Sequence, residues 1–371
     1  MATKFSDSIR SLVHARHLNL TMEALDSLAP PSRFSGVTFD RVEGMLLGLA
    51  IGDALGNTSE GMIPGQRRNK YGEIRDYLPN RHIDSHAAGL PSDDTQMAFW
   101  TLEHQIESGR IDPQQLASIF ATRQIFGIGS TVSAFVKSFR EDAPWYEASQ
   151  RSAGNGALMR IAPVLLPHLE SPSLALWEDA ILTAAITHND SSSIGACVAF
   201  VGILWDLLAK AKPPSPEWWL DSYCERARQI EQNARLKAKT PDSRYEGPIW
   251  RFVNEHVRPA LSEEIDARSA CDRWYSGAYL LETVPSVLFI LARHGQEPEE
   301  AIVRAVNDTK DNDTVGAIVG AAMGALHGRS HLPERWIAGL TGRSAHNDDG
   351  RIFELIEMAK KKWKPWLPAS R

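Results

Sequence analysis

Apolar residues recur every three or four positions along most of this chain, which is the spacing of one face of an α-helix. Clear examples are residues 43–56, EGMLLGLAIGDALG, and residues 95–107, TQMAFWTLEHQIE. The same spacing predicts further helices over 113–122, 130–139, 174–187, 191–211, 218–238, 249–260, 275–293, 298–307, 313–327 and 350–361. Period-two runs rich in Val, Ile and Thr, typical of strands, are nearly absent. The pattern therefore predicts an all-α domain.

Residues 1–38 are predicted to be an N-terminal extension, and residues 39–371 the body of the protein. Two short helical faces precede a linker-like break at residues 29–32, Ala-Pro-Pro-Ser. These faces are formed by Ile9, Leu12 and Val13, and by Met22, Leu25 and Leu28. Within the body, residues 212–275 combine prolines, a Trp-Trp pair and a charged stretch. We interpret them as a helical elaboration whose charges form a solvated face, with a substrate-binding cap as the alternative.

Glycine recurs every fourth residue in two of the predicted helices. Each glycine inside a helix costs about 1 kcal/mol relative to alanine, so eight of them need a compensating reason. Residues four apart lie on one helix face, where a glycine strip lets another backbone come close. We expect two tightly packed central helices, with packing on each other as one arrangement. The rows are Gly44, Gly48, Gly52 and Gly56, and Gly316, Gly320, Gly324 and Gly328.

Composition narrows the class of protein without naming a function. The chain has 371 residues, of which 43% are hydrophobic and 23% charged, as in a globular protein with a sizeable core. A net charge of -6 gives no electrostatic case for binding nucleic acid. We expect a cytoplasmic protein without a signal peptide or a membrane span, since no apolar run approaches about 18 residues. Three cysteines far apart in the sequence form neither a zinc pattern nor a disulfide framework.

Acidic residues gather at the starts of two predicted helices, in Ser92-Asp93-Asp94-Thr95 and in Asp311-Asn312-Asp313-Thr314. Helix capping explains such residues in part, and for Ser92 it is the favoured interpretation. It explains paired aspartates less well, because neighbouring carboxylates repel one another unless cations compensate. Oxygen ligands without His or Cys suit Mg²⁺, Mn²⁺ or Ca²⁺. On the residues alone, capping and a metal site are evenly matched.

Two further carboxylates belong to this picture. Asp53 lies inside the first glycine row, and Glu60 follows just beyond the end of that helix. If the two glycine-rich helices pack together, these carboxylates converge with Asp311 and Asp313. An EF-hand is excluded, because Val315 would be the fifth loop residue and an alanine, not glutamate, would be the twelfth.

Five collinear motifs resemble the ADP-ribosylglycohydrolase family over about residues 40–330. They are GMLLGLAIGDALGNTSEG (44–61), SDDTQM (92–97), GNGALMRIAP (154–163), THNDSSSIGA (187–196) and KDNDTVGAIVGAAMGALHG (310–328). The resemblance implies a compact, orthogonal multi-helix all-α fold around a central dinuclear site that holds two Mg²⁺ or Mn²⁺ ions.

By position, the resemblance also implies roles for individual residues. The metal ligands would be Ser92, Asp93, Asp94, Asp311, Asp313 and Thr314, with Asp313 bridging. Glu60 and Asp94 would be catalytic, and Asp53 would brace the site. The substrate-binding residues would be Gly127, Gly129, Gly154, Asn155, Gly156 and His188. For His188, a satisfied buried histidine is an equally good interpretation. One departure is Thr309-Lys310, where many members have Gly-Gly; Lys310 would then be free to contact an anionic group.

The implied reaction releases ADP-ribose from a modified protein side chain through an oxocarbenium-like state. Two cations would orient the ribose hydroxyls and lower the pKa of a bound water, while glycine loops offer backbone N–H groups to the diphosphate. Arginine is the expected linkage; serine, O-acetyl-ADP-ribose and ADP-ribosylated nucleic acid are alternatives.

The extension allows two interpretations, since compact members of the family begin close to the first motif. Residues 1–38 are either an extra helical segment docked on the body or a protein-binding arm. One version of the arm belongs to an immunity protein that binds and neutralises an ADP-ribosyltransferase toxin. A binding-only pseudoenzyme is a competing class, against which the intact acidic residues argue. A dinuclear phosphohydrolase is disfavoured, because such sites generally include histidines.

Overall fold

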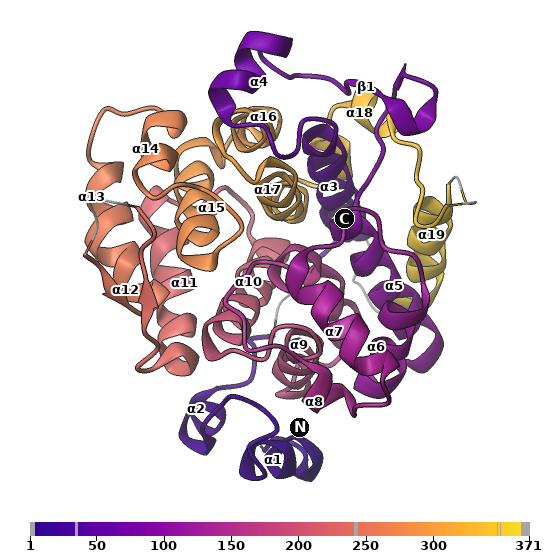
Figure 1. Ribbon diagram of the computed structural model, residues 1–371, viewed down its shortest axis with the longest axis vertical. Coiled ribbons are helices and arrows are strands. Elements are labelled where there is room, and N and C mark those ends of the chain that lie inside the picture. Colours follow the sequence, from indigo (N-terminus) through magenta and orange to yellow (C-terminus); the bar gives the residue numbers. More distant parts are fainter. Residues whose placement is uncertain (1–3, 34–35, 241–243, 347, 349, 365–371) are drawn as a thin grey trace.

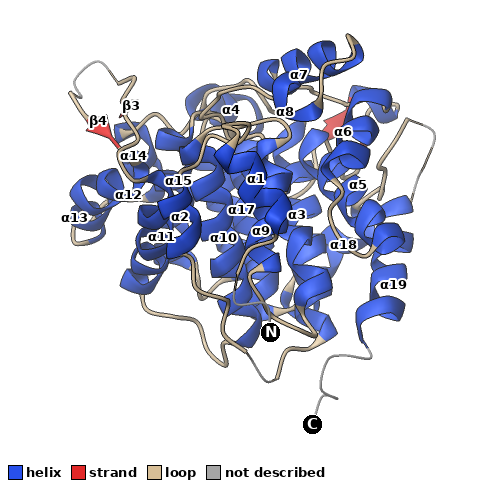
Figure 2. Cartoon of the chain, turned by 90° about the horizontal axis from the view of Figure 1, so that it is seen from below, coloured by secondary structure: helices blue, strands red, loops and turns tan. Residues whose placement is uncertain are grey.

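Helices make up nearly all of the regular structure in the computed structural model, which confirms the all-α prediction (Figures 1 and 2). The structure describes residues 4–33, 36–240, 244–346, 348 and 350–364. The α-helices of the first half are α1 (Asp7–His14), α2 (Met22–Ser27), α3 (Phe39–Asn57), α4 (Pro64–Tyr71), α5 (Asp93–Ser108), α6 (Pro113–Thr122), α7 (Ser130–Arg140), α8 (Trp145–Ala148) and α9 (Ala175–Ala185). Those of the second half are α10 (Ser191–Ala209), α11 (Pro216–Glu231), α12 (Ile249–Phe252), α13 (Arg258–Leu261), α14 (Ala267–Arg273), α15 (Leu280–His294), α16 (Pro298–Asp308), α17 (Asn312–His327), α18 (Glu334–Gly339) and α19 (Arg351–Trp363).

Short helical turns and two small hairpins make up the rest of the regular secondary structure in the described residues. The 3-10 turns are η1 (Arg81–Ile83), η2 (Leu158–Arg160), η3 (Ala162–His168) and η5 (Arg329–His331), and η4 (Val253–Val257) is a π-turn. The antiparallel strand pairs are β1 (Pro79–Asn80) with β2 (His86–Ala87), and β3 (Leu236–Lys237) with β4 (Glu246–Gly247).

The two glycine-rich helices, α3 and α17, run antiparallel and side by side through the middle of the protein (Figure 1). A Cβ atom added at Gly48 would collide with the carbonyl oxygen of Gly320, and one at Gly52 with that of Gly316. The two backbones therefore touch, and the predicted tight packing is confirmed. We call this contact the glycine seam; it consists of Gly44, Gly48, Gly52, Gly56, Gly316, Gly320 and Gly324. The last predicted member, Gly328, instead follows the end of α17 with a positive φ of 87°.

Two predicted helix boundaries are wrong, for the same reason. The helix expected from residue 275 begins at Leu280, because Tyr275 and Ser276 adopt left-handed backbone angles with φ of 81° and 51°. The helix expected to reach residue 238 ends at Glu231, because Gln232 has a φ of 43°. Residues 158–168 were not predicted to be helical; they form η2 and η3, and Pro163 and Pro167 interrupt any longer helix there.

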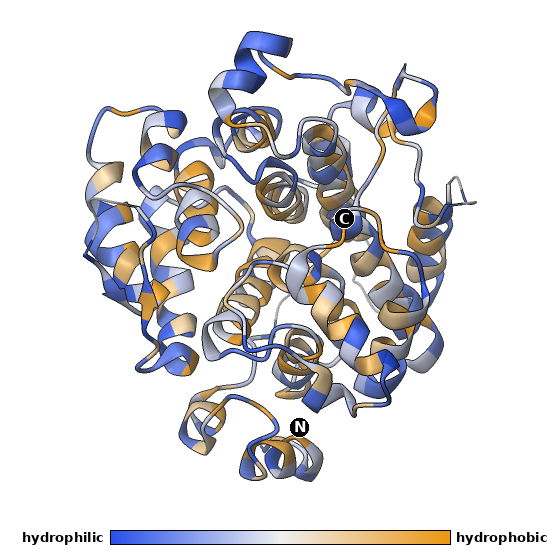
Figure 3. Ribbon diagram, in the orientation of Figure 1, coloured by the Kyte–Doolittle hydropathy of each residue, from blue (hydrophilic) through white to orange (hydrophobic). Residues whose placement is uncertain are grey.

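Helix α10 is long and apolar enough to span a membrane, with a mean hydropathy of 1.8, so the expectation that no segment meets this test was wrong. However, 89% of the window is buried inside the protein, as in the core helix of a globular domain. Figure 3 shows the contrast between the largely hydrophobic α10 and the hydrophilic α4 at the edge.

The N-terminal segment packs on the body, which is the docked arrangement of the two that the sequence allowed. Its apolar residues Phe5, Ile9 and Val13 are buried in the common core. The Ser6 hydroxyl donates a 2.6 Å hydrogen bond to Glu178 of α9, and the Trp177 indole donates one of 2.7 Å to the carbonyl of Ala29. Parts of the predicted extension, residues 1–3 and 34–35, lie outside the described residues.

The predicted elaboration comprises α11 to α14 and the β3–β4 hairpin, and residues 241–243 within it lie outside the described residues. It packs against α10 and α15, with Trp219 almost fully buried. It is therefore continuous with the helical core.

Candidate active site

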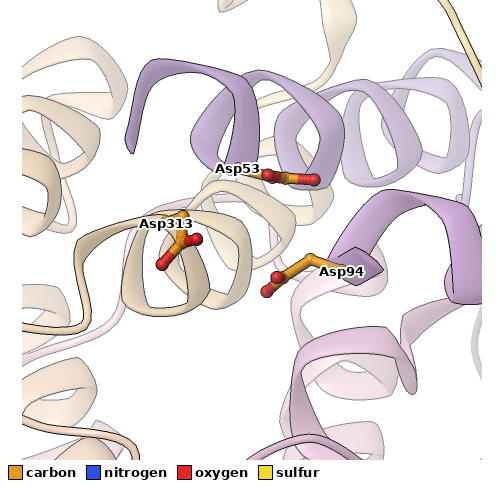
Figure 4. A group of neighbouring side chains, drawn as sticks. All are labelled: Asp53, Asp94 and Asp313. Carbon is orange, nitrogen blue, oxygen red and sulfur yellow. The ribbon is translucent and has the colours of Figure 1, made fainter. Parts of the chain in front are cut away.

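Three helices bring three carboxylates together at one end of the glycine seam. Asp53 comes from α3, Asp94 from the start of α5, and Asp313 from the start of α17. One oxygen atom of each lies within 4.8 Å of the others, and all three side chains are buried. Figure 4 shows the side chains turned toward one another. The seam explains the meeting, since it places the C-terminal half of α3 beside the first turn of α17.

Asp53 holds the start of α5 in place. It accepts hydrogen bonds from the backbone N–H of Ser92 (2.9 Å) and of Thr95 (3.1 Å), and from their hydroxyls at 2.8 and 2.6 Å. This is the bracing expected of Asp53, although the same carboxylate also belongs to the cluster of three. Ser92 occupies the N-cap position, but its side chain makes no capping hydrogen bond, so the capping interpretation of Ser92 was wrong. Its hydroxyl is engaged by Asp53 instead.

The buried cluster and the neighbouring, half-buried Asp311 are acidic groups that lie close together. Burial and then the charge of Asp313 raise the pKa of Asp53 to about 6 and that of Asp311 to about 8. Burial, followed by repulsion from Asp53 and Asp313, raises the pKa of Asp94 well above its usual range. The Oδ1 atom of Asp94 is buried and has no hydrogen-bond partner among the described residues.

These features fit a bound hard cation. The unpartnered Asp94 oxygen would be a ligand of a divalent cation, and the positive charge would offset the repulsion between the carboxylates. Carboxylate and hydroxyl oxygens are the ligands that such ions prefer. Asp53, Asp94 and Asp313 are the residues placed to hold it. Asp94 and Asp313 also line a cavity, together with Asp93, Asp311 and Thr314.

A cavity of about 920 Å³ opens beside the carboxylates. It brings together every predicted site residue except Ser92, which borders a neighbouring cavity of about 830 Å³. The predicted residues that line the larger cavity are Glu60, Asp93, Asp94, Gly127, Gly129, Gly154, Asn155, Gly156, His188, Asp311, Asp313 and Thr314.

The glycine loop at residues 154–156 is fitted around His188. A Cβ atom at Gly156 would lie 2.9 Å from the His188 ring, so the close approach requires glycine there. The His188 side chain is buried, and its Nδ1 lies 2.8 Å from the Thr187 hydroxyl. Burial and the nearby charge of Arg160 lower the pKa of His188 to about 3, so the ring is neutral. His188 is thus both a satisfied buried histidine and part of the cavity wall.

Asn155 joins this loop to the acidic cluster. Its side-chain amide donates hydrogen bonds to Asp311 at 2.5 Å and to the Thr283 hydroxyl at 3.0 Å. The sequence predicted Asn155 as a substrate residue, and the structure adds a contact with the second acidic helix start.

Glu60 and Gly127 lie where the two cavities meet. The Glu60 side chain reaches solvent, yet partial burial and the charges of Asp313 and Asp53 raise its pKa to about 7. Gly127 has a positive φ of 71°, and a Cβ atom there would lie 3.4 Å from Asp93. A Cβ atom at Gly129 would meet nothing within 4 Å, so space does not require glycine at that position.

Lys310, in the Thr309-Lys310 departure, packs on Tyr275, which lines the cavity. The Lys310 ammonium lies 3.2 Å from the centre of the Tyr275 ring, and the backbone N–H groups of Lys310 and Asp311 both donate to the Ser276 carbonyl. Sequence reasoning singled out Lys310 but missed this rim of the cavity, which is formed by Tyr275, Lys239, Tyr279 and Glu282. No spacing in the sequence could have identified it, since the rim depends on the two left-handed residues before α15.

Known proteins resemble this chain over most of its length. A profile of the ADP-ribosylglycohydrolase family matches residues 35–365. An uncharacterised protein of Archaeoglobus fulgidus is 31% identical over 309 residues, covering 82% of this chain and 92% of the relative. The ADP-ribosylarginine hydrolase Tri1 of Pseudomonas putida is 27% identical, covering 80% of this chain and 73% of its own.

A solved structure, described as an ADP-ribosylglycohydrolase-related protein complex, superposes with a TM-score of 0.63 at 26% identity. It covers 88% of this chain and 98% of the other. With the family profile spanning most of the sequence, this chain belongs to the ADP-ribosylglycohydrolase family.

Proposed function

We propose that this protein hydrolyses the bond between ADP-ribose and an arginine side chain of a modified protein. The observation that carries the proposal is the joining of two halves at one cavity: a buried carboxylate cluster and a glycine loop, linked by the Asn155–Asp311 hydrogen bond. A substrate with a diphosphate and a ribose needs both kinds of surface within one binding site.

Different residues of the cavity would contact the diphosphate, contact the ribose and transfer a proton. The loop around Gly154 and Gly156 lines the cavity and lets a diphosphate come close to the backbone, and the neutral His188 ring closes the wall behind it. The carboxylates face the ribose end. Glu60, whose pKa is about 7, can exchange a proton with water or the leaving group near neutral pH.

We infer two Mg²⁺ or Mn²⁺ ions as the cofactors, held by the carboxylates named above together with Thr314 and Ser92. When bound, such ions supply Lewis acidity toward ribose hydroxyls and water. The surplus of buried carboxylates over cationic partners supports this inference.

The arginine linkage is supported by the relative named as an ADP-ribosylarginine hydrolase, whose similarity covers 80% of this chain. The test is to incubate the protein and Mg²⁺ with arginine-ADP-ribosylated and serine-ADP-ribosylated proteins in parallel. We expect release of ADP-ribose from the arginine-linked substrate, and none from the Asp93→Ala/Asp94→Ala variant. Release from the serine-linked protein alone would contradict the linkage, and no release from any substrate would favour a binding-only protein.

Toxin neutralisation through residues 1–38 stays a prediction from the sequence. Deleting the segment would remove its buried apolar residues and expose the core surface that they cover, so reversing two exposed charges, Asp7→Lys and Glu23→Lys, is the cleaner test. If an arm binds an ADP-ribosyltransferase toxin, the double variant should bind it more weakly and hydrolyse normally. Unchanged toxin binding would count against these two residues as the contact.

A further inference from the structure

Two arginines, Arg67 on α4 and Arg160 in η2, are completely buried. Within the described residues, neither forms an ion pair with a carboxylate. Arg67 donates to backbone carbonyls, and Arg160 donates to backbone carbonyls and to the Thr187 hydroxyl. An unpaired buried guanidinium is costly and rare. Each therefore calls for a reason beyond filling space.

Arg67 connects the Glu60 segment with the start of α17. Its Nη2 donates to the carbonyl of Met62 at 2.8 Å, and its Nη1 donates to the carbonyls of Val306 at 2.8 Å and Thr309 at 2.9 Å. Met62 is two residues after Glu60, and Thr309 is two residues before Asp311. One rigid group thus fixes the spacing between the segment that carries Glu60 and the segment that leads to Asp311 and Asp313.

The charge of Arg67 also acts on this cluster. Burial lowers the pKa of Arg67 to about 10, and Asp313 is the carboxylate that counteracts this most. The guanidinium is a fixed positive charge behind a crowded set of negative ones, where its attraction offsets part of their mutual repulsion.

Arg160 makes the corresponding connection in the glycine-loop half of the cavity. Its Nε donates to the carbonyl of Gly156 at 3.1 Å, and its Nη2 donates to the Thr187 hydroxyl at 2.8 Å. That hydroxyl in turn lies 2.8 Å from Nδ1 of His188. The guanidinium also lies over the Phe120 ring, 4.7 Å from its centre. Arg160 therefore fixes the glycine loop relative to the histidine that it surrounds.

We propose that Arg67 and Arg160 are positioning residues with separate duties: Arg67 sets the geometry of the carboxylate half, and Arg160 that of the glycine-loop half. A planar fork with five N–H donors can hold carbonyls of separate segments in a fixed geometry, whereas a lysine offers three donors on a single rotatable nitrogen. The ligands assigned to the two halves rest on the proposed function, whereas the two sets of contacts do not.

The experiment is a crossed binding test on the full-length protein. Arg67→Met and Arg160→Met remove each guanidinium at similar length, and Arg67→Lys and Arg160→Lys retain the charge. Mn²⁺ binding to metal-free protein is measured by electron paramagnetic resonance, and ADP-ribose binding by calorimetry at saturating Mn²⁺. Neither measurement depends on turnover.

We expect Arg67→Met to weaken Mn²⁺ binding by about tenfold or more, as loss of a group that orients metal ligands does, with ADP-ribose affinity changed less than about threefold. Arg160→Met should do the reverse. The lysine variants should show the same pattern at smaller amplitude, and they serve as the test if a methionine variant does not fold. Equal losses of both affinities in every folded variant, or no loss in any, would overturn the proposal.

The test separates this inference from the proposed function. If the wild type binds Mn²⁺ and ADP-ribose but does not cleave arginine-linked ADP-ribose, the proposed function fails and the crossed pattern is still expected. If cleavage occurs and the crossed pattern is absent, the positioning roles fail alone.

Discussion

Along most of their length, α3 and α17 meet through glycine backbones, whereas at one end they meet through carboxylates. In the glycine seam each contact brings one backbone close to the other, with no side chain between them. In the cluster of Asp53, Asp94 and Asp313, the charge of Asp313 opposes ionisation of Asp53, and the charges of both oppose ionisation of Asp94. The contrast teaches how a strained site is held: the seam supplies the rigidity that keeps repelling side chains together, as expected where function is maintained at the expense of stability.

The largest effect should follow from breaking the seam. Gly48→Val would push a branched side chain into the backbone of α17, and we expect the free energy of unfolding to fall by more than about 4 kcal/mol. Gly65→Ala is the matched control, because a Cβ atom there meets only the tip of Arg268 at 3.7 Å. It should be neutral or stabilise by up to about 1 kcal/mol. Denaturant unfolding checks both, and a Gly48→Val protein of wild-type stability would refute the seam.

In the cluster, by contrast, a substitution is expected to raise the free energy of unfolding of the metal-free protein. Asp94→Asn removes a carboxyl that resists ionisation, so the metal-free protein should gain at least about 1 kcal/mol near pH 7.5. Its hydrolytic rate should nevertheless fall by about 1000-fold, which corresponds to roughly 4 kcal/mol in the barrier. Unfolding of metal-free samples and a single-turnover assay give the two values. A variant that is both less stable and fully active would show that the carboxylate is structural.

A carboxylate outside the cluster separates the effect of burial on a pKa from the effect of neighbouring charges. Glu231 is buried away from the cluster, accepts hydrogen bonds from Tyr223 and the Trp250 N–H, and has a pKa raised to about 8, mainly by burial. Because the folded pKa lies above the unfolded one, its contribution to stability is complete below about pH 4.5 and is lost as pH rises through about 8.

The expected slope is about 1.4 kcal/mol per pH unit between these values, with or without metal. Glu231→Gln should flatten the stability profile by that amount in urea titrations across this range. A slope that disappears only when metal is added would assign the pH dependence to the cluster instead.

Much of this contrast was predictable from the sequence, because both regions depend on residues at regular spacings. The glycine rows predicted the seam, and the acidic helix starts predicted the cluster once the two helices were assumed to meet. The sequence placed Asp53 near the site but not among the metal ligands. Its position depends on hydrogen bonds to Ser92 and Thr95, which lie 39 or more residues away in the sequence.

What the sequence did not predict depends on burial of polar groups. Arg67 lies in the hydrophilic stretch GQRRNK, where periodicity indicates a solvated helix and nothing indicates one buried guanidinium. The late start of α15 depends on left-handed residues, Tyr275 and Ser276, that are not glycine. Tertiary contacts decide both features, and local patterns do not contain them.

The most direct test of the central claim, that the carboxylate cluster is a divalent-cation site held by the seam, is a Mn²⁺ titration of metal-free protein followed by denaturant unfolding. At a free concentration of 100 times Kd, the wild type should gain about 2.7 kcal/mol, and Asp94→Asn should gain little at the same concentration. Mn²⁺ that stabilises both proteins equally, or neither, would contradict the account.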